Sequence, residues 1–163
     1  MDRILVRASG PLRGDIDASG SKNSSLALLA ASLLAPEKTV IENVPWLRDV
    51  DLMLEILRAM GASAEWECEG SHTVHIDAST VSKPEAPYEL VRKMRASFLV
   101  LGPLLARFGT ARVSEPGGCA IGVRPVDQHL KGFEGLGAKL RLDAGTIEAT
   151  ATELRGAQIT FDL

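Results

Sequence analysis

One segment in the first half of the chain carries apolar residues at the spacing of an amphipathic helix. Val50, Leu54 and Leu57 lie along one stripe, and charged positions separate them. Asp49 is suited to cap the start of such a helix, and Gly61 offers a left-handed stop at its end. We therefore expect an amphipathic helix between Asp49 and Gly61.

The same pattern returns later in the chain. The stretch from Asp51 to Ala62 aligns with the stretch from Asp127 to Ala138, with Leu54 opposite Leu130 and Leu57 opposite Phe133. The second helix is expected to begin at Pro125, which fits a first helical turn, and to close at Gly137. Self-similarity of this kind predicts a structural unit that is used more than once.

The elements around each amphipathic helix are also repeated. A long apolar helix precedes it and leads to a short strand, which predicts helices at 23–34 and 95–108 and strands at 39–42 and 110–114. Pro103 removes a backbone donor inside the longer helix, and we expect a kink there.

A pair of strands follows each amphipathic helix. These pairs are expected at 62–67 with 73–76 and at 138–142 with 146–149, and Asp143-Ala144-Gly145 is a compact hairpin signal. Short strands are also expected at Val6-Arg7, Gly14–Ala18 and Ala157–Phe161. The pattern as a whole predicts an α/β (α+β) fold.

Composition narrows the class of protein. The chain has 163 residues, of which 45% are hydrophobic and only 4% aromatic, so its core should be aliphatic. A net charge of -3 argues against general binding of nucleic acid. No apolar run approaches membrane-spanning length, and the N-terminus lacks the layout of a signal peptide. Cys68 and Cys119 show neither metal-ligand nor disulfide spacing, which favours a reduced, cytoplasmic compartment.

The histidines do not predict a metal centre. His72 and His75 flank a short strand, where residues three apart face opposite ways. His129 falls on the second amphipathic helix and could line the site, although a solvated face is the simpler interpretation. We expect neither a metal nor a cofactor.

The segment Glu115–Asp127, which reads EPGGCAIGVRPVD, is the richest in chemistry. It places the Cys119 thiol in a glycine-dense loop, with Arg124 five residues further on. Glycine lets backbone amides approach a ligand closely, and the following helix start favours anions. This context favours a reactive cysteine over a buried structural one.

A second anion-friendly segment lies near the start of the chain. Small polar residues surround Lys22 and Asn23 just before an apolar helix. They supply caps and backbone donors, while Lys22 adds a point charge suited to phosphate. Alone, this segment is also consistent with an ordinary capped helix.

Together, these segments resemble the UDP-N-acetylglucosamine 1-carboxyvinyltransferases, a family of enolpyruvyl transferases in peptidoglycan synthesis. Besides the cysteine loop, the matching motifs are Gly20-Ser21-Lys22-Asn23, Asn43-Val44-Pro45, Asp49-Val50-Asp51, His75-Ile76-Asp77, Met94-Arg95-Ala96-Ser97, Leu101–Gly109 and Gly132–Ala138. The resemblance covers essentially the whole chain.

The resemblance implies an inside-out α/β barrel of repeated βαβαββ units, of which this chain is expected to hold an incomplete set. Residues 1–20 would join a second domain in the family, and residues 21–163 would form two of three units of the first domain plus one strand. The third unit and the second domain are expected to be absent. Apolar helix faces left uncovered would then favour self-association.

The resemblance also implies the reaction and its residues. The enolpyruvyl group of phosphoenolpyruvate would pass to the 3'-hydroxyl of UDP-N-acetylglucosamine, with release of phosphate and with Cys119 as proton donor. The implied catalytic residues are Cys119, Lys22 and Arg124. The implied phosphoenolpyruvate ligands are Lys22 and Asn23, and the implied UDP-sugar ligands are Arg95, Arg124, Pro125, Val126, Asp127 and Gln128. Whether Arg48 also approaches substrate stays open.

Two alternatives compete with this interpretation. In the family, an aspartate that handles the sugar hydroxyl and a further arginine lie in the second domain, so this chain alone is expected to be inactive. A non-catalytic fragment or UDP-sugar-binding module is therefore one alternative. The sister transferase that acts on shikimate 3-phosphate is the other, although it lacks the Gly-Gly-Cys loop. Alkylation by fosfomycin would separate the two enzymes.

Overall fold

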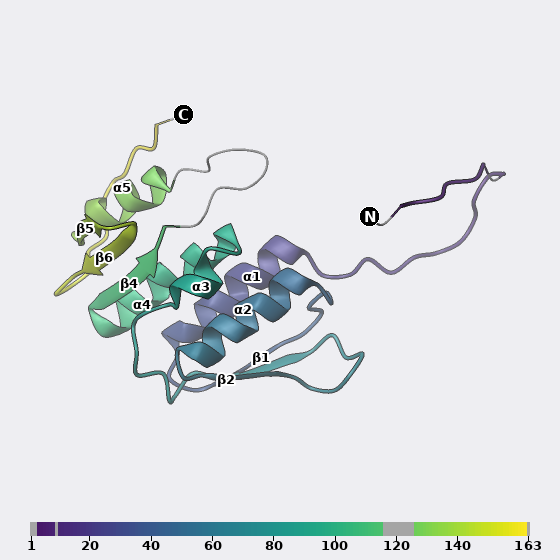
Figure 1. Cartoon of the computed structure of the whole chain (residues 1–163), viewed down its shortest axis with the longest axis horizontal. Coiled ribbons are helices and arrows are strands. Elements are labelled where there is room, and N and C mark those ends of the chain that lie inside the picture. The colour runs from purple at the N-terminus through teal and green to yellow at the C-terminus, as the bar shows by residue number, and fades with distance from the viewer. Residues whose placement is uncertain (1–2, 9, 116–125, 163) are drawn as a thin grey trace.

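A computed structural model describes residues 3–8, 10–115 and 126–162 of the chain. The first half forms one compact unit. Its elements are α1 (Lys22–Ala31), the 3-10 helix η1 (Ser32–Leu34), β1 (Lys38–Ile41), α2 (Arg48–Ala59), β2 (Ser63–Trp66) and β3 (Val74–Asp77) (Figure 1).

The second half repeats the succession of helix, strand, helix and two strands, with an additional short helix at its start and with its 3-10 helix ahead of the α-helix. It contains α3 (Tyr88–Val91), the 3-10 helix η2 (Arg95–Val100), α4 (Leu101–Phe108), β4 (Thr110–Ser114), α5 (Asp127–Gly135), β5 (Lys139–Asp143) and β6 (Thr146–Thr150). Glu85 also makes an isolated parallel bridge to Arg112 of β4, so this unit begins with a minimal strand of its own.

The two sheets have the same topology. Each has three antiparallel strands with the last strand in the centre, in the orders β1-β3-β2 and β4-β6-β5. At the β5–β6 hairpin, Ala144 and Gly145 both take positive φ angles, as a tight two-residue turn requires. The internal repeat and the hairpin predicted from the sequence are confirmed.

Glycines end the amphipathic helices as expected, but the helix starts differ. Gly61 and Gly137 adopt φ angles of 105° and 94° just beyond α2 and α5. Helix α2 begins at Arg48, with Leu47 at the cap position and no side-chain cap. Asp49 therefore lies in the first turn and is not the predicted cap, which leaves its carboxylate available for another contact.

The long helix predicted at 95–108 is divided. Residues Arg95–Val100 form the 3-10 helix η2, and the α-helix starts at Leu101. Pro103 falls in the first turn of α4, where a missing N–H removes little helical hydrogen bonding. The break therefore precedes the proline, and the expected kink inside the helix is replaced by a change of helix type.

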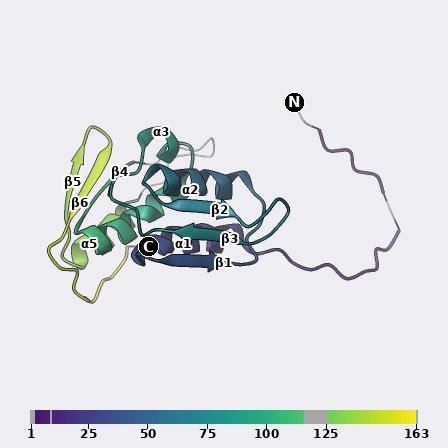
Figure 2. The ribbon, with the colours of Figure 1, turned by 90° about the horizontal axis from the view of Figure 1, so that it is seen from below.

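Three predicted strands do not form. Among the described residues, Val6-Arg7, Gly14–Ala18 and Ala157–Phe161 have no regular secondary structure. The N-terminal segment extends away from the body of the molecule (Figures 1 and 2), and Ile4 and Ile16 are 92% and 94% exposed there. A short strand needs a partner for its backbone groups, and these segments have none among the described residues.

The core lies where the helices meet one another and the inner sheet faces. Helices α1 and α2 pack side by side, and α2 covers β2 (Figure 2). Among the most buried side chains are Leu29, Leu33, Met53, Leu54, Leu57, Leu101, Leu104 and Leu105. This aliphatic core holds α1 and α2 in fixed relative positions, so their N-terminal residues are presented side by side.

Candidate functional site

The entrance of α1 is fastened to the loop that precedes α2. Ser21 caps α1 and accepts a hydrogen bond from the Ser24 N–H at 3.4 Å. The Gly20 N–H donates to Asn43 Oδ1 at 3.0 Å. A Cβ on Gly20 would lie 1.7 Å from the Asn43 carbonyl oxygen, so only glycine fits this approach.

This contact brings the predicted phosphate ligand beside an acidic residue. Lys22 Nζ lies 2.8 Å from Asp49 Oδ2, and the two side chains are 47% and 40% exposed. Asp49 belongs to the first turn of α2, where the partial positive charge of the helix end favours a carboxylate. The ion pair therefore joins the start of α1 to the start of α2.

A cavity of about 380 Å³ opens at this junction. Apolar side chains form its floor, among them Leu26 and Phe98, which are 2% and 3% exposed. Its remaining lining residues are Lys22, Asn23, Asp49, Met94, Arg95, Ala96, Leu99, Val126 and His129. Charged groups around a small apolar floor are suited to orient a polar ligand.

A buried serine shapes the turn that carries Arg95. Ser97 is fully buried, and its hydroxyl donates to backbone carbonyl oxygens of Val91 and Met94. These two oxygens also accept backbone hydrogen bonds from the Met94 and Ser97 N–H groups, so the hydroxyl adds a further tie between η2 and the turn after α3. Arg95 follows Met94 at the start of η2 and is exposed at the cavity.

The structure brings together only part of the predicted set. Lys22, Asn23, Arg95 and Val126 line one cavity, although they come from three separate parts of the chain. Arg48, at the start of α2, does not line it. Cys119, Arg124 and Pro125 lie outside the described residues, so their predicted roles stay predictions.

Asp127 and Gln128, two of the predicted UDP-sugar ligands, do not line the cavity. The Gln128 amide donates to Asp127 Oδ2 at 2.9 Å, and its Oε1 accepts from the Asp162 N–H at 3.0 Å. In this structure, therefore, Gln128 joins α5 to the segment after β6, and Asp127 contacts Gln128.

Two further residues line the cavity in roles that the sequence does not favour. The sequence predicts Asp49 as a helix cap, and for His129 it favours a solvated face over a place in the site. His129 is exposed but lines the cavity, where its ring meets Phe98 edge-on with centroids 5.8 Å apart. Only the packing of α5 against η2 creates this contact, and no local pattern indicates it.

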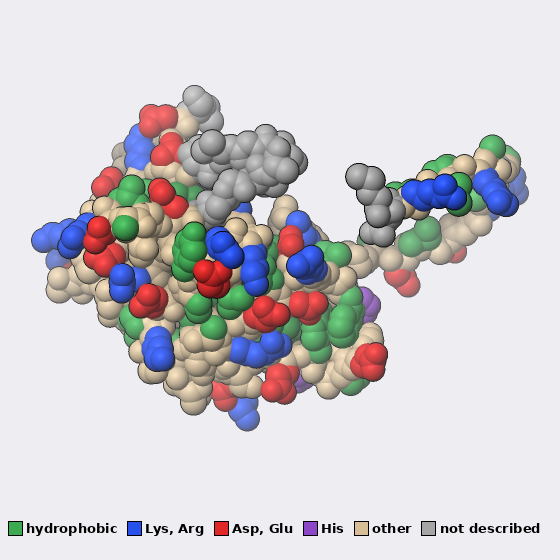
Figure 3. Space-filling model, in the orientation of Figure 1, with side chains coloured by type: hydrophobic (Ala, Val, Ile, Leu, Met, Phe, Trp, Pro, Cys, Tyr) green, Lys and Arg blue, Asp and Glu red, His purple; other side chains and the backbone are tan. Residues whose placement is uncertain are grey.

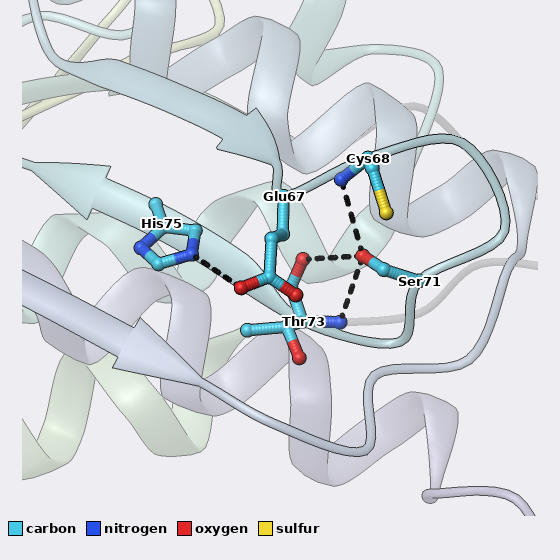
Figure 4. A network of polar contacts seen from close by, with 5 residues as sticks. All are labelled: Glu67, Cys68, Ser71, Thr73 and His75. Carbon is cyan, nitrogen blue, oxygen red and sulfur yellow. Dashed lines mark hydrogen bonds and ion pairs between the residues drawn. The ribbon is translucent and has the colours of Figure 1, made fainter.

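Cys68 lies in the connection between β2 and β3 and is exposed. Its backbone N–H donates to Ser71 Oγ at 3.4 Å, and Ser71 in turn donates to the Thr73 carbonyl oxygen. Figure 4 shows these contacts beside the His75–Glu67 pair, and none of the drawn contacts involves the sulfur. Cys68 therefore belongs to a hairpin connection outside the cavity lining.

The model for the family described as EPSP synthase (3-phosphoshikimate 1-carboxyvinyltransferase) matches residues 6–163. The chain belongs to this family. Solved structures of the family's fold agree. The enolpyruvyl transferase NikO from Streptomyces tendae superposes on this chain with a TM-score of 0.74 and 32% sequence identity. The match covers 88% of this chain and 31% of the NikO chain. EPSP synthase from Acinetobacter baumannii is 20% identical with a TM-score of 0.60 and shows the fold alone.

Curated relatives within the family are more similar in sequence. The UDP-N-acetylglucosamine 1-carboxyvinyltransferase of Myxococcus xanthus is 52% identical over the whole of this chain, which spans 39% of that protein. The enzyme of the same name from Dichelobacter nodosus is 54% identical, and the chain spans 38% of it. The chain therefore spans about two fifths of the length of these relatives.

The part-length match agrees with the architecture. The described residues form two open three-stranded sheets with helices on their inner faces and do not close a barrel. This confirms the expected enolpyruvyl transferase fold in incomplete form. The division into residues 1–20 and 21–163 stays a prediction.

Three further features of the described residues concern metal binding, surface charge and membrane spanning. The described residues hold no group of three or more His, Cys, Asp and Glu side chains placed to bind a metal ion. Acidic and basic side chains are interspersed over the face seen in Figure 3. Within the described ranges, no helix combines the length and the apolar character that crossing a membrane needs.

Proposed function

We propose that this chain provides one wall of a site that transfers the enolpyruvyl group of phosphoenolpyruvate to the 3'-hydroxyl of UDP-N-acetylglucosamine, with release of phosphate. The observation that carries the proposal is the identity of 52% and 54%, over the whole chain, to proteins named for this reaction. The product would enter peptidoglycan synthesis in the cytoplasm.

The cavity supports the proposal through its charge. Two cationic side chains, Lys22 and Arg95, line it from separate elements, and Asn23 lines it as well. Phosphoenolpyruvate and a UDP-sugar both carry phosphate oxygens, which ammonium and guanidinium groups bind well. We assign Lys22 and Asn23 to phosphoenolpyruvate and Arg95 to the UDP-sugar.

The cysteine loop supplies the chemistry in this proposal. Cys119 would donate the proton to the methylene carbon of phosphoenolpyruvate, while Arg124 would hold its anionic groups. Deprotonation of the sugar hydroxyl needs a base that this chain's proposed set does not include. We therefore expect the 163-residue chain alone to bind UDP-N-acetylglucosamine weakly and to release no phosphate.

Transfer to shikimate 3-phosphate is the alternative within the family. The family model that matches is named for that reaction. However, the structure of EPSP synthase is only 20% identical to this chain, so it supports a common fold and not a common substrate. A module that binds UDP-sugar without catalysis is the alternative outside enzymes.

Binding to the isolated chain separates these possibilities. NMR titration with UDP-N-acetylglucosamine should shift the signals of Arg95, whereas titration with shikimate 3-phosphate should not. Replacement Arg95→Ala should weaken UDP-sugar binding about tenfold, because it removes a charged hydrogen bond to phosphate. Arg92→Ala is the matched control, since Arg92 lies three residues away, pairs with Glu89 and does not line the cavity.

The opposite preference would overturn the proposal. Saturable shifts with shikimate 3-phosphate and none with UDP-N-acetylglucosamine would assign the chain to the other reaction. Equal effects of Arg95→Ala and Arg92→Ala would remove Arg95 from the site.

A further inference from the structure

The lysine proposed to receive phosphate already has a partner in the cavity. Lys22 Nζ and Asp49 Oδ2 are 2.8 Å apart, and both residues line the cavity. A negative charge on the wall of an anion site opposes ligand binding, so its presence there calls for a physical account.

The two partners are held to different degrees. Asp49 has a short side chain on α2, and the adjacent Val50 is fully buried, as is Met53 one turn further. The first turn of α2 also favours its charge. Lys22, by contrast, carries its ammonium on a flexible four-carbon stem. The carboxylate is therefore the fixed partner, and the ammonium is the one that can move.

We propose that Asp49 is a built-in counter-ion of Lys22. Its carboxylate holds the ammonium at the cavity, and an incoming anion must take the place of this carboxylate beside the ammonium. This inference rests on the proposed role of Lys22 as a phosphate ligand. Asp49 acts through Lys22 and is therefore a positioning residue, not a catalytic one.

The arrangement has a consequence for turnover. Each anion that takes the ammonium from Asp49 binds less tightly than it would to an unpaired lysine. When phosphate leaves, the ammonium returns to a waiting carboxylate. Asp49 thus weakens ground-state binding of anions and facilitates the release of phosphate.

The test is the affinity of the 163-residue chain for two probes, phosphoenolpyruvate and inorganic phosphate, measured by NMR titration. We expect Asp49→Asn to bind both about two- to fivefold more tightly, in line with the value of an exposed ion pair. Asp49→Glu should bind both probes with the wild-type affinity, because it keeps a carboxylate within reach of the Lys22 ammonium. Lys22→Met should weaken binding at least fivefold.

A matched control separates this effect from helix stability. Asp51 also lies in the first turn of α2, but its carboxylate accepts from Trp66 Nε1 at 3.0 Å. Asp51→Asn removes the same charge from the same helix end and should leave both affinities within twofold of wild type. In the Lys22→Met background, Asp49→Asn should tighten binding less than it does in the wild type.

The outcomes are distinguishable. If Lys22→Met weakens binding but Asp49→Asn does not tighten it, the counter-ion role is wrong and the proposed site stands. Equal tightening by Asp49→Asn and Asp51→Asn would also overturn the counter-ion role. If Lys22→Met binds both probes as well as wild type does, the assignment of Lys22 is wrong and the inference falls with it.

Discussion

At the scale of single residues, Gly20 decides where the candidate site forms. The sequence predicts a capped helix start around Lys22, and in the structure the cap is Ser21. The sequence does not show why a glycine precedes the cap, because the reason is the close approach of the Asn43 carbonyl oxygen, 23 residues further on. Side chains that meet only through tertiary packing, such as Lys22 with Asp49, leave no local signal.

Gly20→Ala is expected to disrupt this junction. The added methyl would meet the Asn43 carbonyl oxygen at 1.7 Å, so one of the two segments must move. We expect a loss of about 1–3 kcal/mol of unfolding free energy, typical of overpacking. Urea denaturation would measure it, with Gly70→Ala as a control in open space, where a positive φ still adds a small cost. Equal losses in the two variants would show that the contact with Asn43 is unimportant.

At the scale of elements, the repeat could be predicted because both copies show the same spacing of apolar residues and a glycine at the end of the amphipathic helix. Both three-stranded sheets and both amphipathic helices appear where the pattern indicates. The predicted strand at Ala157–Phe161 fails because strand formation depends on a neighbour that apolar spacing does not reveal. That segment instead lies against α5, with Phe161 close to Gly132 and Ile159 close to Gly135.

An ion pair at the end of this segment gives a pH-dependent prediction. Lys131 donates a hydrogen bond to the Asp162 carboxylate at 2.7 Å. This hydrogen bond and the charge of Lys131 lower the pKa of Asp162 below the ordinary 3.8, and Gln128 makes a smaller contribution in the same direction. A carboxyl group with a lowered pKa contributes its full stabilisation at pH values above its ordinary pKa. This stabilisation is lost as the pH falls through the lowered pKa. Carboxyl NMR titration should show this low midpoint, and Lys131→Met should return it toward 3.8. An unchanged midpoint in Lys131→Met would contradict the pairing.

At the scale of the whole molecule, apolar side chains remain uncovered. Leu34, Tyr88 and Leu142 are 52%, 56% and 62% exposed, and Ile4 and Ile16 of the N-terminal segment are more exposed still. Strands β2 and β5 also lie at sheet edges. Uncovered apolar residues and open edges favour association.

The isolated chain is therefore expected to self-associate. Sedimentation velocity over a wide range of concentrations should show a mass that rises with concentration. Leu142→Lys, on an exposed edge strand, should reduce the association, since the change removes an exposed apolar side chain and the added charge opposes pairing of the strand edge with another chain. A cooperative monomer throughout the range would show that the two units make a sufficient core.

The central claim is that this chain supplies the UDP-N-acetylglucosamine wall of an enolpyruvyl transferase. The most direct measurement is phosphate release by a chimera in which this chain replaces the matching 39% of the Myxococcus xanthus relative. The account predicts release that requires phosphoenolpyruvate and UDP-N-acetylglucosamine, that Cys119→Ala abolishes and that Cys68→Ala leaves unchanged. Release with shikimate 3-phosphate as acceptor, or full activity in Cys119→Ala, would contradict it.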